Sequence, residues 1–152
     1  ISIYIMDEDD YQKLLDIVTN EETNTILHTS LQDITIRKEN LLKELYLSNE
    51  YKNELLLKLK HYRYVMELPD LEIGNYIRWI NLNNGDNIYL TNGSFISNIM
   101  ILEDGIQIRC TNRFGKIHQL KFDENLIFQK LTEQEHILLQ LVECVKTNKI
   151  KC

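Results

Sequence analysis

Cys110 and His118 are the two residues whose types and spacing could form a nucleophile and its base. They fall on two successive runs of β-type sequence, so neighbouring strands would bring the thiol and the imidazole together. The alternation of apolar and polar residues places both of them on faces that we expect to be buried. We therefore predict structural roles for both residues and no catalytic activity.

Other signatures of catalysis or metal binding are absent from the sequence. It contains no Gly-x-Ser-x-Gly, phosphate loop, His-Glu-x-x-His or dinucleotide fingerprint. The histidines are dispersed, without the i, i+4 spacing of a helical metal site: His28, His61, His118 and His136. The cysteines are also far apart, with no Cys-x-x-Cys: Cys110, Cys144 and Cys152. We predict no metal, no cofactor, no small-molecule substrate and a reducing, intracellular location such as cytoplasm, nucleus or virus particle.

A group of cationic and aromatic residues is the best candidate for a binding site. The chain carries a net charge of −6, and residues 1–30, with seven acids and one lysine, account for all of it. In the nearly neutral remainder, four cations gather around the Phe114-Gly115 turn. Such a mixture suits either a peptide or a nucleic acid. The predicted binding residues are Tyr89, Arg109, Arg113, Phe114, Lys116 and Lys121.

The elements that would position this group lie within residues 74–131. Short runs of β-branched and aromatic residues alternate there with glycine-containing turn signals, which predicts an antiparallel meander. Three dipeptides are of the kind that type I′ hairpin turns prefer: Asn84-Gly85, Asn92-Gly93 and Asp104-Gly105. The runs predict five or six strands: Tyr76–Ile80, Ile88–Leu90, Phe95–Leu102, Ile106–Cys110, Lys116–Phe122 and Leu126–Lys130.

Alternation predicts which face of these strands is buried. Ile106, Ile108 and Cys110 share an apolar face of one run. In the next run the apolar face carries His118, Leu120 and Phe122. An open meander would leave two exposed edges, so we expect it to curl into a small closed or nearly closed β-barrel. Its expected aromatic core consists of Trp79, Phe95, Phe122 and Phe128.

A series of short motifs follows the same order of turns and strands: Gly85-Asp86, Ile88-Tyr89-Leu90, Asn92-Gly93-Ser94-Phe95, Ile106-x-Ile108, Phe114-Gly115-Lys116 and Leu120-x-Phe122. The series resembles the KOW-type SH3-like barrel of NusG-type transcription elongation factors, over residues 85–131. The glycine that this pattern has after the Phe95 segment is absent. The resemblance implies an SH3-like fold for this region and a link to transcription.

The part of the chain before the barrel, residues 1–69, is predicted to be a helical arm or hairpin. Asp7 to Asp10 suit the positive end of a helix dipole. Helical spacing continues from Leu31 to Met66, where the polar patch Ser48–Glu54 is either a turn between two helices, which we favour, or the middle of one. Read as heptads, the pattern places Lys38 in the apolar seam. The predicted interaction face, which needs the barrel or a second copy as its partner, consists of Ile34, Leu41, Leu45, Leu55, Leu59 and Tyr62.

The last part, residues 132–147, is predicted to be a single helix that packs on the arm or on the barrel. Thr132 and Glu135 have the residue types and the spacing of a capping box. With a helical arm over residues 1–69 and a barrel over residues 74–131, the chain is predicted to have an α+β fold.

These features predict a non-catalytic interaction and assembly module that joins a larger complex through its arm and its barrel. A protein partner or self-association is favoured, and a nucleic-acid-associated transcription accessory factor is an alternative. The sequence has no alanine and is rich in Asn, Ile and Lys, as AT-rich genomes encode. A structural subunit of a large DNA virus particle is therefore the other alternative. No apolar run approaches the ~20 residues of a membrane span.

Overall fold

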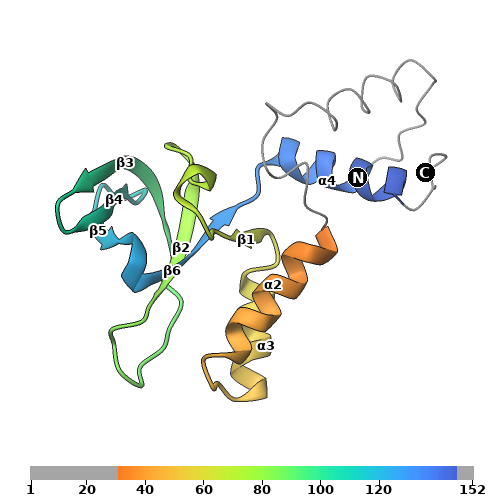
Figure 1. Cartoon of the computed structure of the whole chain (residues 1–152), viewed down its shortest axis with the longest axis horizontal. Helices are drawn as coiled ribbons and strands as arrows, with labels where there is room; N and C mark the ends of the chain where they lie inside the picture. The colour runs from red at the N-terminus through yellow and green to blue at the C-terminus, as the bar shows by residue number, and fades with distance from the viewer. Residues whose placement is uncertain (1–30, 147–152) are drawn as a thin grey trace. The chain divides into compact units, whose positions relative to one another are not determined.

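The computed structural model describes residues 31–146, and the chain divides into two units. One unit comprises residues 37–131; the described parts of the other, residues 31–36 and 132–146, are treated by themselves. The described residues form three α-helices and a six-stranded antiparallel sheet, which confirms an α+β fold (Figure 1). The predicted helix start at Asp7–Asp10 lies outside the described residues.

Two helices, α2 (Leu31–Lys43) and α3 (Asn49–Lys58), form the favoured hairpin. The turn comes earlier than predicted, because residues 49–54 already belong to α3. Ser48 is the N-cap of that helix, and its Oγ accepts a hydrogen bond of 3.2 Å from the Tyr51 N–H. A serine side chain satisfies an N–H group that the first helical turn leaves unpaired. Ser48 therefore starts the second helix and is not part of a longer polar turn.

The predicted helical pattern up to Met66 is wrong in its last part. The helix α3 ends at Lys58, and residues Tyr62–Tyr64 form the strand β1. This strand pairs antiparallel with β6 (Asn125–Lys130), where Tyr64 lies opposite Phe128. A short run rich in tyrosine fits a strand as well as a helix, and pairing with β6 decides between them.

The six strands form one open sheet in the order β1-β6-β2-β3-β4-β5. The remaining strands are β2 (Tyr76–Asn81), β3 (Ser94–Leu102), β4 (Gly105–Thr111) and β5 (Ile117–Lys121). The predicted closed or nearly closed barrel is not confirmed, because the sheet is open, with β1 and β5 as edge strands. The 3₁₀ turn η3 (Phe122–Glu124) leads the chain from β5 to β6, which pairs with β2 and not with β5. The predicted strand Ile88–Leu90 is only an isolated bridge from Leu90 to Ile80.

The open sheet is nevertheless strongly curled. The ring centroids of Trp79 on β2 and His118 on β5 lie 5.7 Å apart, although β3 and β4 separate these strands in the sheet. The curled face encloses the first core, formed by Val65, Leu71, Ile77, Trp79, Ile96, Ile108, Cys110, Leu120 and Ile127. The predicted alternation is thus confirmed for Ile108, Cys110 and Leu120.

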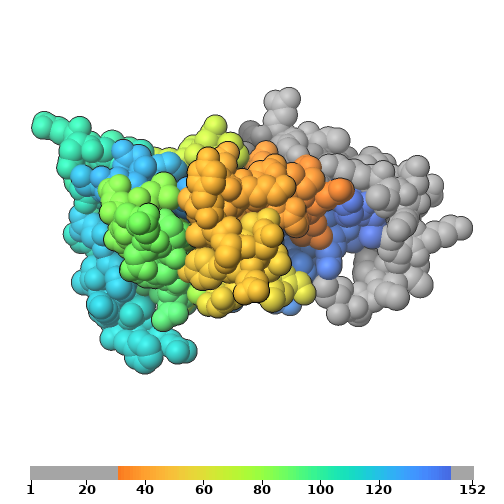
Figure 2. Space-filling model, turned by 90° about the horizontal axis from the view of Figure 1, so that it is seen from below, coloured from red at the N-terminus to blue at the C-terminus, as the bar shows by residue number. Residues whose placement is uncertain are grey.

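A second core joins the helical hairpin to the sheet. Its buried members are Leu42, Leu55, Leu59, Tyr62, Ile80, Leu126 and Phe128. Because Ile127 lies in the first core and Phe128 in the second, β6 is buried on both faces. The Tyr51 hydroxyl adds a hydrogen bond of 2.8 Å to the Ile88 carbonyl, and Figure 2 shows α3 in gold against the green 82–93 segment. The helices therefore cover the face of the sheet that the first core does not use.

One of the four predicted core aromatics is on the surface. Trp79 and Phe128 are buried and Phe122 packs against the first core, but the side chain of Phe95 is 46% exposed. Its neighbours Ser94 and Ile96 are buried instead, since side chains alternate along a strand. The ring of Phe95 makes a T-shaped contact with the ring of Tyr76, and the two ring centroids lie 4.8 Å apart.

The glycine-containing turns are present, but they are not of type I′. A type I′ turn needs positive φ at both central residues, and Tyr46 is the only non-glycine residue with positive φ in the described chain. In the β3–β4 hairpin, Leu102 pairs with Gly105, so two residues form the turn. Gly105, which has a φ of 123°, follows directly after them. The positive φ thus falls on the glycine after the turn and not on the two turn residues.

Lys38 shows how a polar residue fits into the apolar seam of α2. Its side chain is 4% exposed, and its Nζ donates a hydrogen bond of 2.6 Å to the carbonyl of Leu59 at the end of α3. A cation suits the carbonyl end of a helix, where the last carbonyls lack partners within the helix. Burial lowers the pKa of Lys38 below its ordinary value of 10.5. This ammonium group therefore caps α3 but is held in a poorly solvated place.

Raising the pH from about 7 to about 9.5 is expected to stabilise the wild-type chain relative to Lys38→Met. Below 10.5, unfolding exposes a lysine that binds its proton more tightly than in the folded state. Stability therefore rises with pH as the buried ammonium is lost. Burial raises the pKa of Cys110, Tyr62 and Tyr64, which opposes this trend as the pH rises, but equally in both proteins, so the comparison with Lys38→Met isolates the lysine. Urea unfolding of the two proteins across this range measures the difference, and a constant difference would contradict the prediction.

The third helix, α4 (Glu133–Lys146), begins with the predicted capping box. The Thr132 Oγ1 accepts a hydrogen bond from the Glu135 N–H, and the Glu135 Oε1 accepts one from the Thr132 N–H, each of 3.1 Å. Among the side chains of this helix whose burial the structure describes, Leu139 and Val142 are the most buried, whereas Ile137 is exposed. Within residues 31–146, no helix is both long and apolar enough to cross a membrane.

Candidate functional site

The tip of the β4–β5 hairpin is ordered by one asparagine. Asn112 Oδ1 accepts hydrogen bonds of 2.9 Å from the backbone N–H groups of Phe114 and Lys116. Its own backbone N–H donates to the Lys116 carbonyl and its carbonyl accepts from the Gly115 N–H, each at 3.0 Å. An Asx turn of this kind fixes the backbone of a tight turn. The residues at the tip are therefore held in place while their side chains remain outside the core.

Phe114 and Arg113 project from this tip. The ring of Phe114 is 80% exposed, and the guanidinium carbon of Arg113 lies 5.0 Å from its centroid. A cation over an aromatic face at this distance is a cation–π contact. The pair presents both charge and apolar surface at the tip.

Exposed apolar residues continue from the tip onto the outer face of the sheet. The register places Phe95 opposite Thr111 and Thr111 opposite Ile117, so these side chains share one row. Phe95 and Ile117 are both exposed in that row. We call this surface the β4–β5 patch; its residues are Phe95, Phe114, Ile117, Arg109, Arg113 and Lys116.

The structure brings together only part of the predicted binding set. Arg109, Arg113, Phe114 and Lys116 belong to the β4–β5 patch. Lys121 lies at the other end of β5, where its Nζ is 3.9 Å from a Glu124 carboxylate oxygen. Tyr89 precedes Leu90, which bridges Ile80, so it lies near the end of β2 that is remote from the patch.

Phe95 and Ile117 were not among the residues predicted to bind. Ile117 was placed opposite the apolar face by alternation, but an isoleucine on a polar face did not by itself mark a surface. Phe95 was assigned to the core because of its size. The alternation of Ser94, Phe95 and Ile96 indicated that Phe95 lies on the opposite face from its two neighbours. Only the register of β3 with β2 and β4 shows that the face of Phe95 is the outer one.

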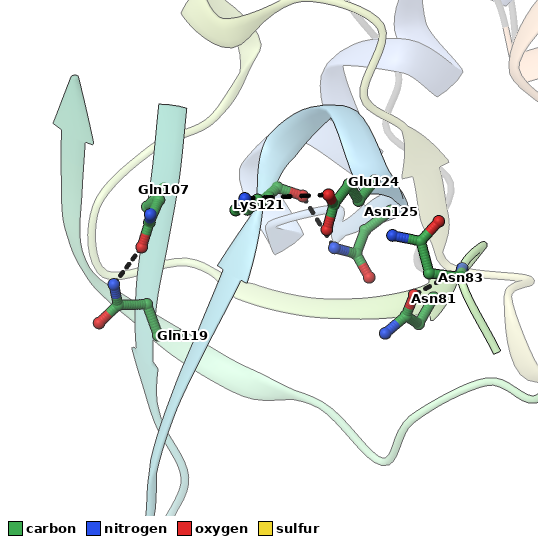
Figure 3. A network of polar contacts seen from close by, with 7 residues as sticks. All are labelled: Asn81, Asn83, Gln107, Gln119, Lys121, Glu124 and Asn125. Carbon is green, nitrogen blue, oxygen red and sulfur yellow. Dashed lines mark hydrogen bonds and ion pairs between the residues drawn. The ribbon is translucent and has the colours of Figure 1, made fainter. Parts of the chain in front are cut away.

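A pocket of about 440 Å³ lies beside β5. It is lined by Trp79, Asn81, Gln107, His118, Gln119, Leu120, Lys121, Glu124 and Asn125. Figure 3 shows its polar contacts, among them the hydrogen bond of 2.8 Å from Asn125 Nδ2 to the Lys121 carbonyl. The Asn125 Oδ1 is buried and has no hydrogen-bond partner among the described residues. That atom has almost no accessible surface, so the acceptor that a ligand in the pocket can reach is the partly exposed Glu124 carboxylate.

The thiol of Cys110 is not a reactive group of this pocket. Cys110 and His118 are direct cross-strand partners, as the spacing of the two runs predicted. The thiol is fully buried, however, and burial raises the pKa of Cys110 to about 12. A thiol protonated at neutral pH is a weak nucleophile. Cys110 lies in the first core, and the His118 ring contacts Trp79.

The predicted helical interaction face is occupied by the chain's own sheet. Leu55, Leu59 and Tyr62 are buried in the second core, and Leu41 and Leu45 pack against it. Ile34, in the other unit, is also buried. Of the two partners that the sequence left open, the sheet is the one that the described residues contact.

Similarity to known proteins does not identify the function of this surface. No protein-family model, curated protein or solved structure matches the chain. Within the described part of the chain, no group of three or more His, Cys, Asp or Glu side chains is placed to hold a metal ion. Function is therefore inferred from the β4–β5 patch and the pocket.

Proposed function

We propose that this chain is a non-catalytic interaction module that joins a larger complex by binding a partner protein at the β4–β5 patch. The observation that supports this proposal is the exposure of Phe95 and Ile117 in one row of the sheet and of Phe114 at the adjoining hairpin tip, beside cations. Contiguous exposed apolar surface with a polar rim is typical of protein-binding sites. Arginine and aromatic residues are also the types that contribute most to binding energy at such sites.

The charge around the patch indicates the chemistry of the partner. Arg109, Arg113 and Lys116 lie around these apolar side chains. Within residues 94–121 the acidic residues are Glu103 and Asp104. Those two acids lie in the β3–β4 turn, at the opposite end of the hairpin. A complementary partner presents apolar side chains flanked by aspartate or glutamate, because matched charges raise the association rate and exclude wrong partners.

A second candidate function is binding of single-stranded nucleic acid by a transcription accessory factor. The Arg113–Phe114 pair and the exposed ring of Phe95 support it, since bases stack on exposed aromatic rings beside cations. The resemblance of residues 85–131 to the KOW-type sequence pattern points the same way. A subunit of a large DNA virus particle would use the patch as an assembly contact, in cytoplasm, nucleus or particle.

The two functions are distinguished by binding measurements with peptides and DNA. We would select binders of the full chain from a displayed library of random 12-residue peptides, and measure their affinity by fluorescence anisotropy beside that of a 15-residue oligothymidylate. Peptides with Asp or Glu next to Phe or Leu are expected. Combining Phe114→Ser with Arg113→Ser is expected to weaken them at least tenfold, because it removes the exposed ring and its cation.

Tyr89→Ser is the control, since it removes an exposed aromatic ring outside the patch and should leave the affinity unchanged. Tight, salt-sensitive binding of the oligothymidylate that the patch variant abolishes would instead support the nucleic-acid function. Peptide selections without acidic residues, or binding that the patch variant does not affect, would contradict the proposed partner.

A further inference from the structure

The backbone of β5 has an open side whose direction follows from two hydrogen bonds. The Lys116 carbonyl accepts a hydrogen bond from the Asn112 N–H, so the backbone groups of Lys116 point toward β4. The Lys121 carbonyl accepts a hydrogen bond from the Asn125 side chain, so the backbone groups of Lys121 point away from β4. Backbone groups alternate in direction along a strand. The N–H and C=O groups of Ile117 and Gln119 therefore point to the open edge, where the described chain offers them no backbone partner.

This edge lacks the features that usually protect an edge strand. Proline, bulges, very short length and inward-pointing charges prevent other chains from pairing. The opposite edge strand, β1, has only three residues and carries the buried Arg63. By contrast β5 has five residues, no proline, and its single cation at its last position. It is a longer and more accessible template for an added strand.

We propose that β5 is the docking edge for an extended segment of the partner protein, which adds a strand to the sheet. The inference rests on the proposed function and specifies the conformation of the bound partner. Hydrogen bonds to the backbone of Ile117 and Gln119 hold the added strand. Its side chains then alternate between the curled face and the outer face.

The two faces select different side chains. On the curled face the pocket beside β5 receives a side chain that donates a hydrogen bond to the partly exposed Glu124 carboxylate. Asparagine, glutamine, lysine and arginine have such donors. On the outer face the adjacent residue lies near Arg109 and Ile117, where an acidic or apolar side chain fits. The segment therefore alternates a hydrogen-bond donor with an acidic or apolar residue.

Charge argues for a different protein over a second copy of this chain. Pairing two β5 strands would bring two β4–β5 patches, each with Arg109, Arg113 and Lys116, to one interface. Like charges that face each other across an interface are unfavourable. An acidic partner removes this repulsion.

Amide hydrogen exchange of the full chain tests the edge directly. In the free protein the Ile117 and Gln119 amides are expected to exchange fast, and those of His118 and Leu120 slowly. Binding of a peptide from the 12-residue library is expected to slow the exchange of the Ile117 and Gln119 amides. Gln119→Pro, which removes one outward N–H, is expected to weaken binding of the peptide at least tenfold. Gln119→Ala removes the same side chain but keeps the N–H, so it is expected to weaken binding much less, and the difference between the two variants measures the backbone hydrogen bond.

A peptide N-methylated at alternate residues serves the same purpose if Gln119→Pro does not fold. Methylation in one register is expected to abolish binding, and methylation in the other to be tolerated. Bound peptides that leave the Ile117 and Gln119 amides in fast exchange would overturn the inference, as would a selection that yields no binder. Concentration-dependent protection of these amides, with dimers in light scattering, would assign the edge to a second copy. Loss of binding in the Phe114 and Arg113 variant but not in Gln119→Pro would refute the edge and leave the proposed function standing.

Discussion

Gly93→Ala is expected to destabilise the fold by about 3–4 kcal/mol. Gly93 has φ of 104°, a conformation that side-chain-bearing residues rarely adopt. A Cβ atom there would lie 2.7 Å from the Ile77 carbonyl oxygen and 2.5 Å from the Tyr76 ring. The carbonyl belongs to the backbone of β2 and cannot move without disturbing the sheet. The Tyr76 ring is held as well, by a hydrogen bond of 2.8 Å from its hydroxyl to the Asn92 carbonyl.

The midpoint of urea unfolding measures this loss of stability. Gly115→Ala is the matched control, because Gly115 also has positive φ, of 80°, but no atom lies within 4 Å of the Cβ position. We expect it to cost only about 1 kcal/mol, from backbone strain alone. Equal losses in the two variants would show that the contact with β2 is unimportant. The difference between them isolates the steric contribution.

The second large effect is expected for Gln129→Met, at about 2–3 kcal/mol. Gln129 is almost fully buried on β6, and its Nε2 donates to the Asp70 carbonyl at 3.0 Å. Its Oε1 accepts from the Glu72 N–H, also at 3.0 Å. Methionine has a similar length but leaves the Glu72 N–H without this acceptor. A buried polar group without a partner costs more than the lost hydrogen bond is worth.

The same site contains a second donor, which sharpens the test. Arg63 on β1 is the cross-strand partner of Gln129, and its Nη2 donates to the same Asp70 carbonyl at 3.0 Å. Loss of Gln129 alone therefore leaves that carbonyl partly satisfied. Gln134→Met, an exposed change on α4, is the control and should shift the unfolding free energy by less than about 0.5 kcal/mol. A Gln129→Met protein as stable as this control would refute the structural role of Gln129.

The division of the sheet between its two cores explains where the accessible surface lies. The second core uses β1, β6 and β2, and its members come from those strands and from the helical hairpin. The outer side of β3, β4 and β5 has no helix of the same unit against it in either core. Exposed Phe95 and Ile117 lie on that side. The surface available for a partner is thus the part of the sheet that the helices leave uncovered.

Sequence patterns predicted the features that depend on neighbours along the chain. The alternation in Ile106–Cys110 indicated the buried face of β4, and Thr132 with Glu135 marked the start of α4. Asp104-Gly105 and Phe114-Gly115 correctly marked the turns that separate β3, β4 and β5. The cationic and aromatic residues around Phe114 could be identified because they lie within one hairpin. Each of these signals is complete within a few residues.

Contacts between distant segments required the tertiary structure. Tyr62–Tyr64 fitted a helical stripe, and only pairing with β6 makes it a strand. Phe95 faces outward because of its register on β2 and β4, and a shift by one residue would have buried it. The sheet stays open because β6 pairs with β2, which leaves β5 as an edge. Local patterns specify which residues are apolar and where the chain turns, whereas pairing across the sheet determines which face and which edge remain free.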